Sequence, residues 1–341
     1  MSVFLNGTFV DLDAAKVSAF DAGLQHGVGL FETMLAVKGR EGPAVVGLGE
    51  HMTRLAHSAA ELGLSDSLRE DALSEAVLET VKRSGLMRED ARARVRLTIT
   101  GGDLNMLSRA SGAMRDPTIL IHAQPATAYP AEMMERGVGV TLADMKLNPL
   151  DPFAGHKTLN YWSRLRELQR AAAKQAGEAL VFQVTNHLAG GCVSNAFVVK
   201  DGVLMTPIAR GEEKEVGKES GAGPGTPKAA PAGTKAAKAK SKSKSKAEPV
   251  EVSSMVMPSP VLPGVTRAIL MRHAADNGVR IERRMLTIHD VLGADEVFLT
   301  NSSWGVLPVV KVEREAIGGG EVGALTRRAQ EWWSGELASF E

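Results

Sequence analysis

The 341-residue sequence is short of cysteine, of net charge and of long apolar runs. Its single cysteine, Cys192, excludes an intramolecular disulfide and any zinc site built from several thiolates, and it favours a reducing compartment. Forty basic residues balance forty acidic ones, so the whole chain has no electrostatic attraction to nucleic acid or to an anionic membrane. The eight histidines show no spacing typical of metal ligands, and we expect no metal site.

Segments that would direct the chain to a membrane are also missing. No uncharged apolar stretch approaches the roughly 20 residues that a membrane-spanning helix needs. The start of the chain, MSVFLNGTFVDLD, lacks the basic region and the long apolar core of a signal peptide. These absences predict a soluble, cytoplasmic protein.

One segment, residues 210–248, has almost no side chain that could pack. It carries ten basic residues against five glutamates, and residues 228–246 hold seven lysines and no acid. Burial in such a segment cannot offset the entropy of ordering it, so we expect a disordered insertion at about 210–250. A basic segment can bind nucleic acid or acidic proteins, but a solvated insertion in a surface loop is the simpler interpretation.

The rest of the sequence predicts an α/β fold in two domains. Residues 1–125 show both helical and strand periodicity and predict an α+β domain. A break around Pro130 predicts a linker over residues 126–132, and residues 133–341 predict a β-rich second domain that contains the insertion.

The clearest elements come from apolar periodicity and turn residues. Residues 48–64 carry apolar residues at helical spacing, which predicts a helix, and Gly63 marks the end of that helix. Residues 92–100 alternate between apolar residues and Arg94, Arg96 and Thr98, which predicts a strand. Asp201-Gly202 between two apolar runs predicts a hairpin.

Three short motifs could carry chemistry. Lys157 lies in GHKTLNYW, directly before a helical pattern over residues 158–177. PGVTR, residues 263–267, places backbone N–H groups and a hydroxyl at a predicted helix start, where the helix dipole favours an anion. TNSS, residues 300–303, offers small polar side chains between two strands. Each motif alone is also typical of a surface lysine, an N-cap or a loop.

Together these motifs are far more specific. GHKTLN, then GGCVSN, LPGVTR and FLTNSSWGVLPV, in this order, resemble the class IV aminotransferases, the pyridoxal-phosphate enzymes of fold type IV. That family includes branched-chain and D-amino-acid aminotransferases and 4-amino-4-deoxychorismate lyase. Upstream, FDAGLQHGVGLFET and HMTRLAHSA are similar to the family's amino-terminal motifs. The resemblance implies a homodimer that binds pyridoxal phosphate between its two domains.

The resemblance also implies roles for individual residues. Lys157 would form the Schiff base with the cofactor and move the proton during catalysis. The cofactor phosphate would be held by Arg54, by the N–H groups of Val265 and Thr266, and by Ser302 or Ser303. Tyr161 would lie near the phenolic oxygen of the cofactor, Asn195 near the cofactor, and Phe31 in the substrate pocket. For Tyr161 and Phe31, plain core packing is the alternative.

The sequence departs from the family pattern at three positions. The branched-chain enzymes carry an arginine at the position of Leu35, which speaks against a close assignment to them. Gly190 stands where the family has the glutamate that pairs with the pyridine nitrogen, which would weaken electron withdrawal by the ring. On this basis Gly190→Glu should speed up transamination. The arginine that grips the substrate carboxylate in D-amino-acid enzymes is missing from Thr100-Gly101-Gly102. Arg94 or Arg96 could replace it, or both could be solvated.

Four functions follow, in order of preference. The first is an aminotransferase for an amino acid and a 2-oxo acid. The second is a lyase that releases pyruvate from 4-amino-4-deoxychorismate, in which aromatisation would compensate for weak electron withdrawal. The third is a cofactor-binding relative with weak catalysis, and the fourth is nucleic-acid binding through the lysine-rich segment.

Overall fold

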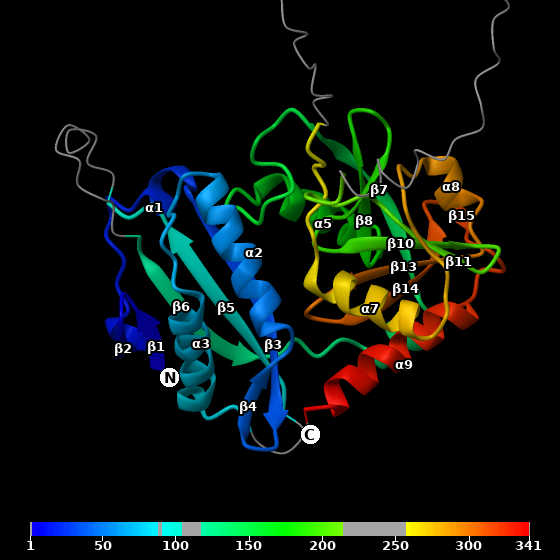
Figure 1. Cartoon of the computed structure of the whole chain (residues 1–341). Coiled ribbons are helices and arrows are strands. Elements are labelled where there is room, and N and C mark those ends of the chain that lie inside the picture. Colours follow the sequence, from blue (N-terminus) through cyan, green and yellow to red (C-terminus); the bar gives the residue numbers. More distant parts are fainter. Residues whose placement is uncertain (1, 88–90, 104–116, 214–256, 341) are drawn as a thin grey trace, which may run out of the picture.

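The computed structural model places two β-sheets beside each other, with helices covering their faces (Figure 1). All strands of the first sheet come from residues 2–125, and all strands of the second come from residues 138–316. The linker expected at 126–132 lies between these two sets of strands. The structure describes residues 2–87, 91–103, 117–213 and 257–340.

Strands and helices alternate irregularly along the chain. The strands are β1 (Ser2–Leu5), β2 (Thr8–Asp11), β3 (Gly29–Gly39), β4 (Gly42–Val45), β5 (Ala93–Thr100), β6 (Ile119–Pro125), β7 (Val138–Leu147), β8 (Glu178–Gln183), β9 (Leu188–Gly191), β10 (Asn195–Lys200), β11 (Val203–Thr206), β12 (Ile281–Arg283), β13 (Glu296–Asn301), β14 (Gly305–Val312) and β15 (Glu315–Ala316). The α-helices are α1 (Ala22–His26), α2 (Leu48–Glu61), α3 (Glu70–Ser84), α4 (Ala131–Glu135), α5 (Trp162–Ala173), α7 (Val265–Asp276), α8 (Ile288–Leu292) and α9 (Ala324–Ala338).

The first sheet is antiparallel, with the strand order β2-β1-β6-β5-β3-β4. Its central strand β5 has the alternation expected from the sequence, because Val95, Leu97 and Ile99 are fully buried against α2 and α3. The opposite face of β5 carries Arg94 and Arg96, which are half-buried rather than solvated. This polar face of the sheet is turned toward the rest of the molecule.

The second sheet is mixed, with the order β12-β11-β10-β13-β14-β7-β8-β9 and β15 paired to β14. The hairpin of β10 and β11 turns at Asp201 and Gly202, both with positive φ, as the Asp-Gly pair predicts. Strand β8, which lies next to the edge strand β9, is buried on both faces. Helix α5 packs on β7 and β8, while α7 and α9 pack on β13.

One hydrophobic cluster joins the two halves of the chain. It combines Leu35 and Val37 of β3 with Phe197 of β10, Phe298 of β13 and Trp333 of α9. Figure 1 shows α9 running along the base of the molecule toward the first sheet. Burial of these side chains therefore fixes the two sheets relative to each other.

The structure corrects several details of the sequence-based prediction. Helix α5 begins only at Trp162, because residues 157–159 are held in extended form by hydrogen bonds to β3. Residues 192–194 form a turn between β9 and β10. The expected linker contains the start of α4, and helix α9 was not predicted.

The first residues of the predicted disordered insertion are ordered in the structure. Arg210, Glu212 and Glu213 are fixed by ion pairs or hydrogen bonds to neighbouring segments. The remainder of that prediction lies outside the described residues. Within the described ranges, no helix is both long and apolar enough to cross a bilayer.

Candidate active site

A cavity of about 640 Å³ lies between the polar face of the first sheet and the second sheet. Its lining comes from β3, β5, the segment before α5, the turn after β9, the start of α7 and the turn after β13. All ten site residues expected from the sequence line it. They are Phe31, Arg54, Arg96, Lys157, Tyr161, Asn195, Val265, Thr266, Ser302 and Ser303.

Lys157 is held in place by the first sheet although it belongs to the second half of the chain. The Phe31 N–H donates to the Lys157 carbonyl at 2.9 Å, and the Leu159 N–H donates to the Gly29 carbonyl at 3.0 Å. These bonds add residues 157–159 to the edge of β3 as a short antiparallel bridge. The lysine backbone is therefore fixed, and Nζ lies 4.3 Å from the centre of the Phe31 ring.

The aromatic rings of Phe31 and Tyr161 pack edge to face, with centroids 5.1 Å apart. The Arg96 guanidinium lies 3.7 Å from the centre of the Phe31 ring. Burial alone would raise the pKa of Tyr161, but the charges of Lys157 and Arg164, together with a hydrogen bond to Lys157, lower this pKa below its ordinary value. Both rings line the cavity.

The start of helix α7 offers backbone N–H groups to the cavity. Gly264 is the N-cap residue and no side chain caps the helix, while Val265 and Thr266 form its first turn. Asn195 Nδ2 donates to the Leu262 carbonyl at 2.8 Å, which holds the loop before the helix. A Cβ atom at Gly264 would overlap the Asn195 side chain. This loop therefore lies close against β10 and leaves the helix N-terminus open to an anion.

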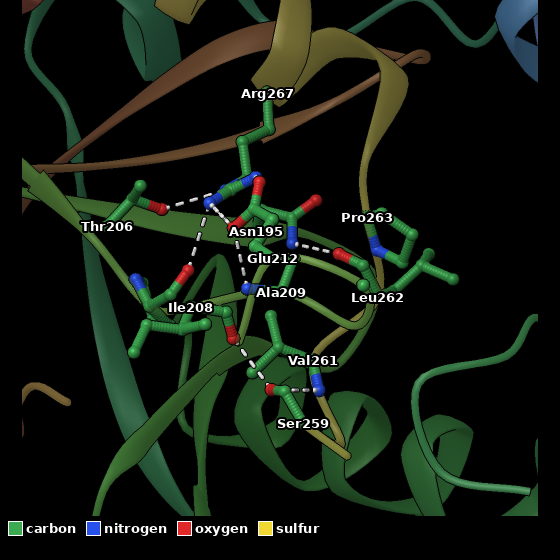
Figure 2. Close-up of polar contacts among 12 residues, drawn as sticks. Asn195, Thr206, Ile208, Ala209, Glu212, Ser259, Val261, Leu262, Pro263 and Arg267 are labelled. Atoms are coloured by element: carbon green, nitrogen blue, oxygen red, sulfur yellow. Dashed lines mark hydrogen bonds and ion pairs between the residues drawn. The ribbon is translucent and has the colours of Figure 1, made fainter. Parts of the chain in front are cut away.

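A buried arginine, Arg267, connects the helix that follows this loop to the segment after β11 (Figure 2). Arg267 is 2% exposed and pairs with Glu212 at 2.7 Å. Its guanidinium also donates to Thr206 Oγ1 and to the Pro207 carbonyl, both at 3.0 Å. Nearby, Ser259 Oγ donates to the Ile208 carbonyl at 2.6 Å. These bonds hold the cavity loop against the end of β11.

Arg54 reaches the cavity from helix α2 and is oriented by a buried acid. Arg54 Nε and Nη2 both donate to the Glu32 carboxylate, and Nη1 donates to the Pro263 carbonyl at 2.8 Å. Burial by itself would raise the pKa of Glu32, but Arg54 and His51 lower it to about 2. The two-donor edge of Arg54 therefore faces Glu32, which leaves single N–H groups on Nη1 and Nη2 for another anion.

His51 continues this network toward the turn after β13. Burial, and then the charges of Arg54 and Lys157, lower the pKa of His51, so the imidazole is neutral at pH 7. Its Nδ1 lies 2.7 Å from the ionised Glu32 carboxylate and must carry the proton, which leaves Nε2 as an acceptor. Ser302 Oγ lies 3.4 Å from Nε2. The network thus connects Glu32 to a hydroxyl that lines the cavity.

Three buried polar atoms of cavity-lining residues have no hydrogen-bond partner among the described residues. They are His156 Nε2, the Thr300 hydroxyl and the Trp304 indole N–H. Unpaired buried polar atoms are uncommon in folded proteins, and here they lie where a polar ligand could satisfy them. No group of three or more metal-ligating side chains occurs among the residues that the structure describes.

At the turn after β9, as in the rest of the lining, no carboxylate of the described residues faces the cavity. Gly190 has φ +143°, and a Cβ atom at this position would lie 2.6 Å from the Ser194 carbonyl oxygen. A glutamate at 190 would strain this backbone. The proposed Gly190→Glu substitution is therefore not the simple restoration of a side chain that the sequence suggests.

The nearest acid, Glu178, is occupied beneath this turn. Its carboxylate accepts from the N–H groups of Ala179, Cys192 and Val193 and from the Ser194 hydroxyl, at 2.8–3.1 Å. Burial raises the pKa of Glu178, while these hydrogen bonds act in the opposite direction. Glu178 does not line the cavity. Its carboxylate holds the turn instead of facing a ligand.

Sequence reasoning missed Glu32, His51, Arg164 and Trp304. Glu32 and His51 lie inside the quoted motifs, but a strand acid and a helix histidine reveal a shared ion pair only when the strand and helix pack together. Arg164 is seven residues after Lys157 and reads as an exposed helix charge. For Trp304 the sequence gives an aromatic in a turn and no sign of an unpaired N–H.

Comparison with known proteins gives one family. Residues 29–212 and 253–312 match the family model described as amino-transferase class IV. A putative branched-chain-amino-acid aminotransferase of Methanocaldococcus jannaschii is 30% identical over 97% of this chain and 94% of its own length.

Solved structures agree with this match. The branched-chain amino acid aminotransferase of Escherichia coli superposes with a TM-score of 0.77 at 26% identity, over 98% of this chain and 93% of that one. A branched-chain amino acid aminotransferase from T.th., solved with pyridoxamine 5′-phosphate, has the same fold, with a TM-score of 0.78 at 23% identity over 100% and 95% of the two chains. The 4-amino-4-deoxychorismate lyase of Pseudomonas aeruginosa gives a TM-score of 0.69 at 25% identity over 96% and 97%.

Proposed function

The chain belongs to the class IV aminotransferase family and has its fold type IV architecture, and from this we propose that it is a branched-chain amino acid aminotransferase. Membership confirms the family, fold and enzyme class expected from the sequence. One observation carries the assignment to this cavity. Lys157 is the only lysine among the described residues that line it, and nine further residues expected at the site surround it.

Pyridoxal phosphate fits the polar groups of this cavity. The uncapped start of α7, with Val265 and Thr266, suits a phosphate dianion, and Arg54 lies beside it through its bond to Pro263. The unpaired donors of Thr300 and Trp304 add hydrogen-bonding capacity. When bound, the cofactor supplies an aldehyde that condenses with amines and a ring that withdraws electrons from the carbon bearing the amino group.

The residues of the chain would then divide the work. The Lys157 amine would attach the cofactor, and after release by the substrate Nζ would carry the proton away from the substrate Cα. Tyr161 has a lowered pKa and a hydrogen bond to Lys157. It would therefore stabilise negative charge on its own oxygen and on the neighbouring phenolic oxygen of the cofactor. The Arg54–Glu32 pair would keep the phosphate end rigid, so that the reacting carbon stays beside Nζ.

The shape and charge of the remaining cavity support an apolar amino acid as substrate. Phe31, Tyr129 and Trp304 give it aromatic sides, and no carboxylate of the described residues lines it. Arg96, fixed over the Phe31 ring, would bind the substrate carboxylate. An aliphatic side chain would lie against the rings. The names of the M. jannaschii and E. coli relatives agree with such a substrate.

Reduction with borohydride tests the attachment directly. Purified enzyme incubated with pyridoxal phosphate should give one modified peptide, with the adduct on Lys157, and Lys157→Ala should give none. Lys174→Ala is the matched control, because Lys174 is an exposed lysine at the end of α5. An adduct on another residue, or no adduct in the wild type, would contradict the proposal.

Steady-state assays then test the substrate. With 2-oxoglutarate as acceptor, L-leucine, L-isoleucine and L-valine should be transaminated, and D-alanine should not. Pyruvate release from 4-amino-4-deoxychorismate without branched-chain transamination would select the lyase instead. Attachment to Lys157 with neither activity would leave a cofactor-binding protein with weak catalysis.

We further propose a cytoplasmic homodimer. The segment around Lys157 exposes several large apolar side chains, which a second copy could cover: Leu150 is 74% exposed, Phe153 57% and Trp162 81%. Cys192, the one cysteine of the sequence, is a buried free thiol, and a chain that forms no intramolecular disulfide suits a reducing compartment. Light scattering at micromolar concentration should give twice the mass of the chain.

A further inference from the structure

The turn after β9 leaves one side of the cavity without the carboxylate that would pair with a protonated ring nitrogen. The backbone at Gly190 disfavours any side chain, and Glu178 is bound to backbone N–H groups beneath the turn. Of the described residues that line the cavity, none is an aspartate or a glutamate. The charged side chains among these lining residues are all cationic.

Arg164 lies at this side of the cavity. Its Nη1 donates to the Cys192 carbonyl at 3.0 Å and lies 3.4 Å from the Gly191 carbonyl, so the guanidinium is fixed on the turn itself. The side chain is half-buried and lines the cavity, and no carboxylate of the described residues pairs with it. Nε and Nη2 keep their N–H groups for another acceptor.

The order of the side chains matches the order of atoms around a pyridoxal ring. Lys157 and Arg164 lie on either side of Tyr161, with Nζ 5.4 Å and Cζ 5.6 Å from the centre of its ring. Around pyridoxal phosphate, the aldehyde carbon, the phenolic oxygen, the methyl group and the nitrogen follow in sequence. With Lys157 at the aldehyde and Tyr161 at the phenolic oxygen, the same order places the methyl group and then the nitrogen toward Arg164.

We propose that Arg164 is the partner of the pyridine nitrogen in this protein. This inference rests on the proposed function, because it requires pyridoxal phosphate in the cavity. A guanidinium is a donor only and keeps its protons, so the nitrogen that accepts from it carries no proton. The ring is then neutral at its nitrogen and withdraws electrons less strongly than a pyridinium does.

Nitrogen-15 NMR of the holoenzyme tests this assignment without measuring activity. Wild-type protein loaded with pyridoxal phosphate labelled at the ring nitrogen should give a resonance in the free-base pyridine range, unchanged between pH 6 and pH 9. Arg164→Gln should make this resonance titrate with pH, and Arg164→Glu should move it to the pyridinium range. Arg164→Gln should also bind the cofactor about tenfold more weakly in fluorescence titrations, the loss expected from one charged hydrogen bond.

Arg166→Gln is the matched control, because Arg166 is exposed on the same helix. It should leave the resonance and the cofactor affinity unchanged. Arg164→Lys keeps the charge and guards against a folding defect, and it should retain the free-base resonance. A pyridinium resonance in the wild type, or an unchanged resonance in Arg164→Gln, would overturn the role of Arg164. If borohydride still traps the cofactor on Lys157, the proposed function survives that result.

Discussion

At the scale of single residues, the buried acid Glu32 organises more of the site than any residue identified from the sequence. It is 1% exposed, accepts two bonds from Arg54 and one from His51, and so directs both side chains. An ionised carboxylate at this depth persists only because it is paired. Arg54 depends on Glu32 for its position as much as on its own helix.

Removing the charge of Glu32 should therefore destabilise the fold. Glu32→Gln leaves the Arg54 guanidinium without its counter-ion, and we expect a loss of about 3–5 kcal/mol in the free energy of unfolding, measured by urea titration. Glu50→Gln is the control, since Glu50 pairs with Arg272 at 3.2 Å on the surface and should cost at most about 1 kcal/mol. Equal losses in the two variants would contradict the role of burial.

At the scale of elements, the site depends on how closely the loop before α7 approaches β10. The Asn195 bond to Leu262 and the lack of a Cβ at Gly264 allow this approach. Beside the loop, Arg267 connects the first turn of α7 to β11 and to Glu212. The start of this helix is thus tied to the second sheet on both sides.

Gly264→Ala should test this approach. The added methyl group would overlap Asn195, push the loop away, and cost about 1–3 kcal/mol of stability together with a weaker affinity for pyridoxal phosphate. Gly335→Ala is the matched control, because Gly335 lies exposed inside α9 with open space around it. It should stabilise the protein by about 0.5–1 kcal/mol. Thermal unfolding and fluorescence titration measure both effects, and unchanged cofactor affinity in Gly264→Ala would argue against this loop as the phosphate site.

At the scale of the whole molecule, acid should lower the free energy of unfolding over two overlapping pH ranges. Burial lowers the pKa of His156 from 6.5 to about 4, so its contribution to stability is present above pH 6.5 and is lost as the pH falls toward 4. The pKa of Glu32 is lowered from 4.5 to about 2, so its contribution is present above pH 4.5 and is lost between there and pH 2.

The melting temperature should thus fall from pH 6.5 downward. His156→Gln should weaken the upper part of this dependence, to which His51 and His122 also contribute because burial lowers their pKa values too. Scanning calorimetry at half-unit intervals of pH measures it. A melting temperature that stays constant from pH 6.5 to pH 4.5 in the wild type would contradict the assignment to His156.

Also at the scale of the whole molecule, we expect the fold to form without the insertion. Its two ends lie side by side, because the Arg210 N–H donates to the Val261 carbonyl at 2.9 Å and Glu213 bonds the Ser259 N–H. Replacing residues 214–256 with a short glycine-serine connection should therefore change the melting temperature by no more than about 2 °C. It should also leave the aminotransferase rate unchanged, and a large fall in either quantity would give the segment a structural role.

Local patterns determined much of this protein. The alternation of β5, the Asp-Gly hairpin and the helix of α2 follow from short-range preferences that act within a few residues. The family, the fold type and the ten cavity residues came instead from the resemblance of the motifs, taken in their order along the chain, to class IV aminotransferases. The start of α5 was misplaced because hydrogen bonds from β3, far away in sequence, compete with helix formation at residues 157–159.

Only the tertiary structure decided what those residues face. A sequence gives no distance between β3 and α2, so the Glu32 ion pair and the neutral His51 arise only when burial removes water from both. The same holds for Gly190 and Arg164. The sequence shows that an acid is missing, but only the positive φ at Gly190 and the bonds from Arg164 to the turn show that the backbone excludes the acid and that a cation lies in its place.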